Sequence, residues 1–228
     1  MIENKKEFFG GAVLMISFVV ILILFFLPIW GGKNGLNYLD NLYNSISKGS
    51  AYYIPDVKEA RDRLQSKPIS VTLMMEGKAQ AEQTAGQLRK AGVRVVAEEG
   101  ALKVTGDLGL IVDAVLEDAD AMYVNNGGKL LDKYGYDERR VLYNWWTAFK
   151  ALDKDFKKQK RFKEADLVVL VKKKAIESSY NYYGVEPQRI GERVGTVVFS
   201  LVFYVLYTLI YGFAILFMFE GWGLKLAH

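Results

Sequence analysis

Cysteine does not occur among the 228 residues, and histidine occurs only as the last residue, His228. A chain without cysteine forms no disulfide, thiolate zinc site, iron–sulfur cluster or covalently attached haem. Without an internal histidine it also lacks a Ser–His–Asp triad and His-ligated haem or copper. These absences predict a protein that binds no cofactor or metal and is not an enzyme, although catalysis by carboxylates or lysine alone stays open.

A strong charge of one sign is missing as well. The formal net charge is +4, from 30 lysines and arginines and 26 aspartates and glutamates. Binding to nucleic acid depends on a pronounced positive charge, which this balance does not provide. We therefore expect no nucleic-acid partner.

Two long stretches carry no charged residue, Phe8–Trp30 near the N-terminus and Val194–Phe219 near the C-terminus. A helix needs about 20 apolar residues to cross a bilayer, so both stretches predict membrane-spanning helices. The first is too long for the apolar segment of a signal peptide and lacks the small residues of a cleavage site. We expect it to remain as an anchor.

Basic residues beside the spans predict the orientation. Lys5 and Lys6 precede the first span and Lys225 follows the second, which favours cytoplasmic tails. The domain side also carries basic residues, at Lys33, Arg189 and Arg193. These favour the opposite orientation, but a long loop is translocated largely regardless of its charge. We predict a two-pass protein of the inner cell membrane, with both termini in the cytoplasm and the main domain outside it.

The region between the spans has strand and helix patterns in the order β-α-β-β-α. Short runs rich in β-branched and apolar residues indicate strands, and apolar residues at helical spacing indicate helices. The expected elements are a strand at Ile69–Met75, a helix at Lys78–Ala91, strands at Val93–Ala97 and Ala101–Thr105, and a helix capped by Asp107. This order is most of a ferredoxin-like core, so we predict an α+β fold.

Helical patterns dominate the rest of the domain. Asp137 is in position to cap a long helix at Glu138–Lys158, and a second apolar pattern covers Phe162–Tyr183. Together they predict a long helical hairpin, although the run Leu167–Val171 could instead be a fourth strand.

Two short helices are expected before the sheet. One is amphipathic, around Leu36–Ile46, and either rests on the bilayer surface or packs under the domain. The other covers Val57–Gln65 with Asp56 as its N-cap, after an extended linker. The predicted organisation is a tail at 1–7, a span at 8–30, juxtamembrane helices at 31–66, the α/β module at 67–126, the helical hairpin at 127–193, a span at 194–219 and a tail at 220–228.

Hydroxyl groups on the second span are candidate partner-binding positions. They recur at spacings of three and four and share one face, at Ser200, Tyr204, Tyr207, Thr208 and Tyr211. Lipid tails cannot satisfy hydroxyl groups. The stripe is therefore expected to bond to its own backbone, to the first span, or to a separate subunit.

Trp145 and Trp146 are further candidates for partner contact. Adjacent positions on a helix point about 100° apart, so the two indoles cannot share one narrow core stripe. We expect one to pack inside and the other to extend the stripe or to lie at an interface. Tyr180, Tyr182 and Tyr183 precede the second span and are expected in the same core or interfacial role.

Two charged patterns complete the set. Glu117, Asp118 and Asp120 lack the ligand spacing of a calcium loop and predict a solvated helix face. The stretch Lys150–Lys174 contains ten basic and four acidic residues. It is interpreted as a solvated hairpin tip, a contact for anionic lipid headgroups, or a docking face for an acidic partner.

The expected function is that of a non-catalytic accessory or scaffold subunit in a larger membrane complex, with an extracytoplasmic protein-interaction domain. Its expected partners are other integral membrane subunits, membrane lipid and a possible second copy of the chain. The alternative is a membrane-anchored sensor or regulator of the envelope state or of a ligand. Tails as short as those outside the two spans leave little room for a signalling module.

Overall fold

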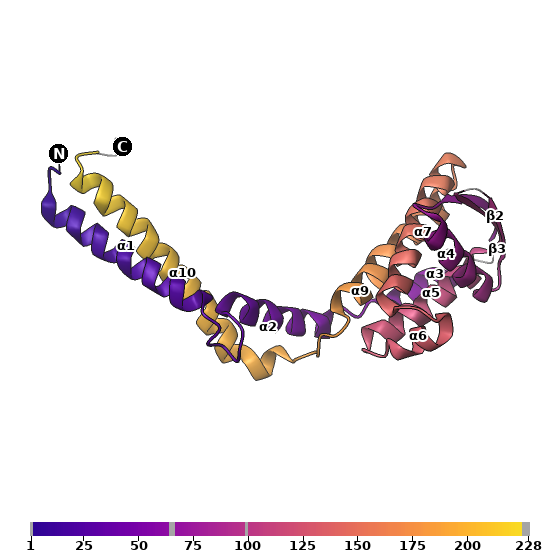
Figure 1. The fold of residues 1–228 in the computed structure, drawn as a ribbon, viewed down its shortest axis with the longest axis horizontal. Coiled ribbons are helices and arrows are strands. Elements are labelled where there is room, and N and C mark those ends of the chain that lie inside the picture. The colour runs from indigo at the N-terminus through magenta and orange to yellow at the C-terminus, as the bar shows by residue number, and fades with distance from the viewer. Residues whose placement is uncertain (1, 64–66, 99, 225–228) are drawn as a thin grey trace. The chain divides into compact units, whose positions relative to one another are not determined.

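The computed structural model describes residues 2–63, 67–98 and 100–224 (Figure 1). The chain folds into two compact units. Unit 1 combines the two ends of the chain, Met1–Gly49 and Glu186–His228, and unit 2 is the intervening Ser50–Val185. Both helices and strands are present, and two of the helices are long and apolar enough to cross a membrane.

The two long apolar helices belong to unit 1. They are α1 (Lys5–Phe26) and α10 (Ile190–Gly221), with mean hydropathies of 2.8 and 2.2 in their most apolar windows. The side chain of Asn4 caps α1 by accepting from the backbone N–H groups of Lys6 and Glu7. The helix ends before Trp30 because Pro28 disfavours helical backbone at Leu27, which is extended.

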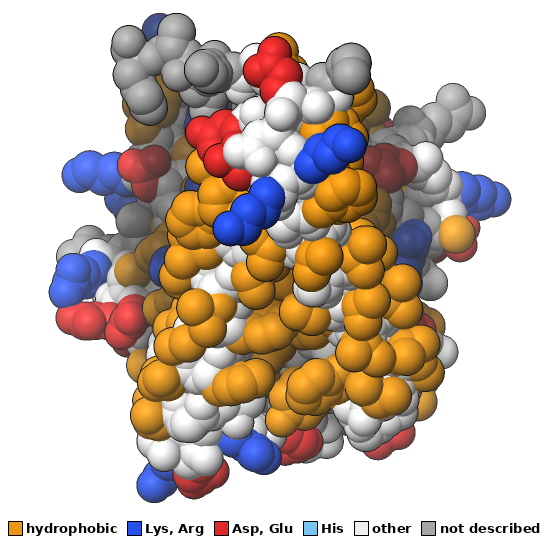
Figure 2. All heavy atoms as spheres, turned by 90° about the vertical axis from the view of Figure 1, so that its left-hand side faces the viewer, with side chains coloured by type: hydrophobic (Ala, Val, Ile, Leu, Met, Phe, Trp, Pro, Cys, Tyr) orange, Lys and Arg blue, Asp and Glu red, His pale blue; other side chains and the backbone are white. Residues whose placement is uncertain are grey.

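The helices α1 and α10 pack side by side, with the beginning of α1 and the end of α10 at the same end of the pair (Figure 1). A Cβ atom on Gly11 would lie 2.7 Å from the backbone nitrogen of Met218 and 2.8 Å from the carbonyl of Ala214. This glycine therefore allows the two backbones to approach closely. On the face of the pair that Figure 2 shows, hydrophobic side chains form a broad band.

A third helix of unit 1, α2 (Gly35–Ser50), is the expected amphipathic helix. It buries Leu42, and the Tyr38 ring lies 6.0 Å from that of Trp30. The hydroxyls of Tyr43 on α2 and Ser200 on α10 share a hydrogen bond of 2.6 Å. Within unit 1, α2 thus contacts α10.

Unit 2 contains a three-stranded antiparallel sheet with the order β1-β3-β2. Its strands are β1 (Pro68–Met74), β2 (Arg94–Glu98) and β3 (Ala101–Asp107). The side chains of Ile69, Val71 and Leu73 are buried, whereas the alternate residues of β1 are exposed. One face of the sheet therefore packs on the core and the other is open.

The helix α4 (Lys78–Lys90) joins β1 to β2 and contacts β2 and β3. After β3, Asp107 caps α5 (Leu108–Tyr123) by accepting from Gly109 N–H, as expected. The contacts of α5 are mainly with other helices, and β1 is contacted instead by α7 (Glu138–Lys158).

The remaining helices of unit 2 are α3 (Ile54–Arg63), α6 (Gly128–Tyr134), α8 (Phe162–Val171), the π-helix η1 (Lys172–Glu177) and α9 (Ser178–Tyr182). Asp137 caps α7, as expected, by accepting from Arg140 N–H at 2.9 Å, and α7 packs against α8. The stretch Leu167–Val171 is helical, so the alternative of a fourth strand there is wrong.

Two local expectations were wrong. Asp56 lies inside the first turn of α3 and is not its N-cap, because the helix begins at Ile54 with Pro55 in the following position, where a missing N–H costs nothing. The expected helix at Phe162–Tyr183 is interrupted by the π-helical turn of η1. The last residues of the expected Val57–Gln65 helix lie outside the described residues.

Candidate partner-binding site

Trp145 and Trp146 occupy neighbouring positions on α7 and have different surroundings. Trp145 is fully buried, with its ring edge-on to Phe149 at 6.5 Å. Its indole Nε1 donates a hydrogen bond of 2.8 Å to the carboxylate of Asp118. Trp146 is only partly buried and packs at the border of the core. The expected division between an inner and an outer indole is therefore present, with Trp145 inside.

Asp118 is 1% exposed, so the expectation that the acidic cluster forms a solvated helix face is wrong for this residue. Besides Trp145, its carboxylate accepts from the Tyr134 hydroxyl at 2.6 Å and from Lys133 Nζ at 2.8 Å. A buried carboxylate is tolerated only when donors surround it. Burial, and then the charge of Asp118, raise the pKa of Tyr134 well above its usual value.

The other two acidic residues of the cluster are also engaged. Glu117 accepts from Lys129 at 2.7 Å and from Lys133 at 3.5 Å, and the Lys129 hydrogen bond contributes most to lowering its pKa. Asp120 accepts from the Tyr52 hydroxyl at 2.7 Å, which raises the pKa of Tyr52 to about 12. The cluster thus holds α5 to neighbouring segments of unit 2.

Trp146 belongs to an aromatic surface that we call the Trp146 patch, defined by Tyr143, Trp146, Glu177 and Tyr180. These residues line a pocket of about 400 Å³ together with Leu142, Ile176 and Asn181. The rings of Tyr143 and Trp146 are stacked, with centroids 6.2 Å apart. The indole Nε1 of Trp146 donates to Glu177 Oε1 at 2.8 Å, which fixes the orientation of the ring.

Cationic side chains surround the Trp146 patch. Lys150 and Lys172 lie over the Trp146 ring, 5.2 and 5.6 Å from its centroid. Arg140 lies over Tyr143 and Arg139 over Tyr180, at 5.3 and 5.6 Å. Tryptophan, tyrosine and arginine are the residues that most often dominate the energy of protein interfaces. The patch therefore has the composition of a protein-binding surface.

The π-helix η1 supplies one side of the patch. It ends at Glu177, whose carboxylate holds Trp146. An inserted π-helical turn shifts the facing of every residue after it, and such turns are frequent at functional sites. The π-helical turn was not predictable from the sequence, because the apolar pattern continues through Ala175 and Ile176 as in an ordinary helix.

The tyrosines before α10, at Tyr180, Tyr182 and Tyr183, belong to unit 2 and pack within it. The Tyr182 ring meets that of Tyr123 edge to face at 6.1 Å. The Tyr183 hydroxyl donates to Glu138 at 2.8 Å, and this hydrogen bond is the main cause of its raised pKa. Tyr180 is 36% exposed and belongs to the Trp146 patch. Core contacts thus account for two of the three residues.

The hydroxyl stripe of α10 divides into an inner and an outer part. The Ser200 hydroxyl bonds to Tyr43, and the Tyr207 ring stacks on Phe18 of α1 with centroids 4.3 Å apart. Tyr204 is 67% exposed and Tyr211 is 44% exposed. The Tyr211 ring also packs on Phe18, with centroids 4.9 Å apart. Contacts within the chain therefore engage Ser200, Tyr207 and Tyr211, and the exposed ring of Tyr204 remains the candidate for a partner.

No protein-family model, no curated protein and no solved structure matches this chain. Among the residues that the structure describes, no group of three or more His, Cys, Asp and Glu side chains is placed to hold a metal ion. That the chain binds no cofactor stays a prediction.

Proposed function

We propose that the chain is a non-catalytic accessory subunit of a larger membrane complex, in which unit 1 is the membrane anchor and unit 2 binds partner proteins. The observation that carries the interaction role is the Trp146 patch, where stacked aromatic rings and four cations border an open pocket. An aromatic surface of this kind gains most when a partner removes it from water.

The apolar exterior of α1 and α10 supports the anchoring role. Only 6% of the most apolar 18-residue stretch of each helix is buried within the chain, so most of its apolar surface faces outward. Large outward-facing apolar surfaces need a hydrophobic environment or a partner. The proposed orientation of the chain in the membrane follows the charges of its tails, with Lys5 and Lys6 in the cytoplasm and unit 2 outside it.

The orientation is tested by single cysteines introduced into this cysteine-free chain. Ser50→Cys and Asn126→Cys place thiols at exposed positions of unit 2. We expect both to react with a membrane-impermeant maleimide in intact spheroplasts. Reaction only after lysis would place unit 2 in the cytoplasm.

The strand order supports a ferredoxin-like interpretation of the sheet. β1 and β2 run in the same direction, joined through α4, and β3 lies between them antiparallel to both. The positions Thr72 and Lys103 face each other across β1 and β3. A double variant, Thr72→Cys with Lys103→Cys, is expected to form a disulfide on mild oxidation. Failure to do so would contradict this strand pairing.

The partner-binding role is tested by purifying the full chain in mild detergent and identifying the membrane proteins that co-purify. We expect a reproducible set, lost with Trp146→Ala and retained with Phe162→Ala, which removes an exposed aromatic ring elsewhere on unit 2. For α10, Tyr204→Leu is compared with Phe213→Leu on the opposite face, nine positions along the helix. If the wild-type chain purifies alone, the proposed function is wrong.

A further inference from the structure

β1 forms one edge of the sheet in unit 2. Within the β1–β3 ladder, Met75 N–H donates to the Gly100 carbonyl at 3.0 Å and Leu108 N–H donates to the Lys67 carbonyl at 3.1 Å. The odd-numbered residues of β1 therefore bond to β3. Because backbone groups alternate in direction along a strand, the even-numbered residues point theirs away from the sheet. β1 is an edge strand, so these groups face outward.

Part of this edge is already covered by side chains. Gln159 Nε2 donates to the Ser70 carbonyl at 3.0 Å, and Arg161 donates to the Pro68 carbonyl at 3.1 Å. Both bonds confirm that the even-numbered carbonyls point outward. Within the described part of the chain, no hydrogen bond reaches the outward backbone groups of Thr72 and Met74. Two N–H groups and two carbonyls thus remain open.

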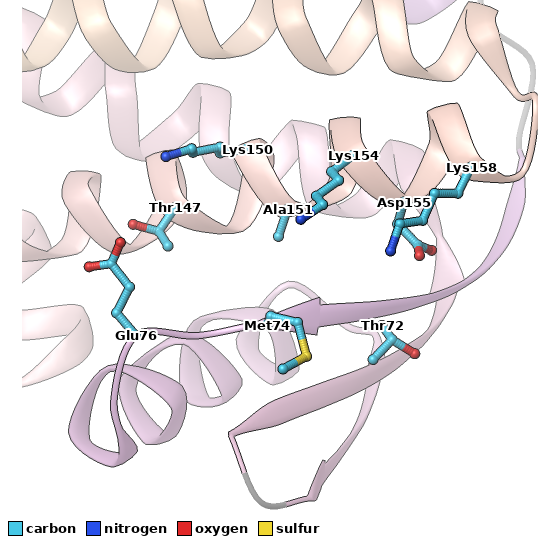
Figure 3. Close-up of a pocket in the computed structure, with 9 residues that line it drawn as sticks. All are labelled: Thr72, Met74, Glu76, Thr147, Lys150, Ala151, Lys154, Asp155 and Lys158. Carbon is cyan, nitrogen blue, oxygen red and sulfur yellow. The ribbon is translucent and has the colours of Figure 1, made fainter.

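A groove of about 210 Å³ runs along this open stretch, between β1 and α7 (Figure 3). Thr72 and Met74 line one side, and Lys150, Lys154 and Lys158 extend from successive turns of α7 on the other. The three lysines are exposed, and none has a carboxylate within salt-bridge distance among the described residues. Lys150 lies where the groove meets the Trp146 patch, because its Nζ is also over the Trp146 ring.

Two carboxylates, Asp155 and Glu76, also line the groove, and they offset only part of the charge of its three lysines. Asp155 accepts a hydrogen bond of 2.7 Å from Gln159, the residue that also donates to the Ser70 carbonyl at the edge of β1. Glu76 lies at the end of the groove near Thr147 (Figure 3). The lysine side chains therefore give the helix side of the groove a positive charge.

The spacing of the lysines matches that of an extended chain. Residues four apart on a helix are about 6 Å apart along its axis, and alternate side chains of a strand are about 6.6 Å apart. The helix α7 and the strand β1 run alongside each other in Figure 3. Carboxylates at alternate positions of a strand added to β1 would therefore meet successive lysines.

We propose that the groove between β1 and α7 binds an acidic, extended segment of a partner polypeptide. The segment adds to the edge of β1 through the open backbone groups of Thr72 and Met74, and its carboxylates pair with Lys150, Lys154 and Lys158. Strand addition supplies affinity through main-chain hydrogen bonds and specificity through alternate side chains. This inference rests on the proposed partner-binding role of unit 2 and names a partner chemistry for it.

The test uses the full chain in neutral phosphatidylcholine nanodiscs and a labelled peptide, Glu-Thr-Glu-Thr-Glu-Thr-Glu-Thr-Glu, whose binding is followed by fluorescence anisotropy at low salt. We expect the alternating peptide to bind at least tenfold more tightly than a peptide of the same composition with its glutamates in one block. Equal affinity for the two peptides would overturn the strand register.

Variants separate the lysine row from general charge. Lys150→Gln, Lys154→Gln and Lys158→Gln together should weaken peptide binding at least tenfold. The matched control combines Lys78→Gln, Lys90→Gln and Lys163→Gln, which remove the same charge from exposed positions outside the groove. We expect the control to change the affinity less than twofold. An equal loss in both variants would show nonspecific charge attraction and overturn the proposal.

Backbone pairing is tested by hydrogen exchange and by a modified peptide. Peptide binding should slow exchange in the segment 68–75, and N-methylation of alternate peptide amides should abolish binding without changing the charge. Thr72→Pro removes one outward N–H while leaving the bonds to β3 in place, so it should also weaken binding. Undiminished binding of the N-methylated peptide would exclude strand addition.

Other outcomes would identify a different occupant of the groove or show which of the two proposals fails. Binding of wild-type nanodiscs to phosphatidylglycerol vesicles, lost with the groove lysines and accompanied by no peptide binding, would assign the groove to lipid headgroups and overturn the inference. If the peptide fails to bind while partners still co-purify through Trp146, only the groove proposal is wrong. If the peptide binds but no membrane protein ever co-purifies, the groove inference stands and the accessory-subunit role fails.

Discussion

Tyr43 and Ser200 share a hydrogen bond of 2.6 Å between their hydroxyls, although they are 157 positions apart in the chain. The Ser200 hydroxyl also donates to the Val197 carbonyl at 2.8 Å, so Tyr43 is the donor in the bond between the two side chains. This bond joins α2 to α10 within unit 1. It gives part of the hydroxyl stripe a role inside the chain.

Removing this hydrogen bond should loosen unit 1. We expect Tyr43→Phe to lower the free energy of unfolding by about 0.5–1.5 kcal/mol, the usual net contribution of one hydrogen bond. Thermal melting of the purified chain in detergent measures the change. Tyr204→Phe removes a hydroxyl from an exposed ring and is the control. A double variant with Ser200→Ala should add little to Tyr43→Phe, and full additivity would show that the two groups do not interact.

The contact of Gly11 with α10 should be sensitive to a single methyl group. Gly11→Ala places a Cβ within 2.8 Å of backbone atoms of Met218 and Ala214, so the helices must separate. We expect a loss of about 1–3 kcal/mol in the stability of unit 1, as for other overpacked sites. Gly10→Ala is the matched control, because nothing lies within 4 Å of its added Cβ. Equal behaviour of the two variants would contradict the described packing of α1 on α10.

Asp118 should be among the most sensitive positions of unit 2. Asp118→Asn removes the charge that pairs with Lys133 and places an amide donor among three donors. Breaking a buried charge pair typically costs about 3–5 kcal/mol. Denaturant titration, followed by fluorescence, should show a large decrease in the midpoint. Asp132→Asn makes the same chemical change at an exposed position and should be close to wild type.

Protonation of Glu117 should make unit 2 less stable in acid. Its pKa is lowered from 4.5, first by the Lys129 hydrogen bond and then by the charge of Lys133. A carboxyl group with a lowered pKa in the folded state contributes stability above its unfolded pKa and loses it as the pH falls through the folded value. Glu117→Gln should therefore be less stable than wild type at pH 7, and the difference should shrink below pH 4.5. A difference independent of pH would contradict this assignment.

Local patterns predicted much of the fold because their causes are local. The caps at Asp107 and Asp137 act on backbone N–H groups two and three residues away. Buried and exposed residues alternate along β1 and β3, and the buried residues of α5 repeat at helical spacing. Sequence periodicity reports these features directly. It also indicated the two long apolar helices.

Features that depend on distant residues were not predictable in this way. Asp118 looks like part of a solvated acidic run until Trp145, 27 positions later, supplies an indole N–H. The open edge at Thr72 emerges only when the strand order and the position of α7 are known. Tertiary contacts decided each of these cases.

The two segments that connect the units are joined by a backbone hydrogen bond within unit 1. The chain leaves unit 1 at Gly49 and returns at Glu186, and Gln188 N–H donates to the Ser45 carbonyl at 3.1 Å. Unit 2 is thus an insertion in unit 1, and the two chain segments that lead to it are hydrogen-bonded to each other within unit 1. Such an arrangement is modular: a short linker in place of residues 50–185 should leave the helix pair intact, and the pair could carry a different cargo domain of any length whose termini lie close together.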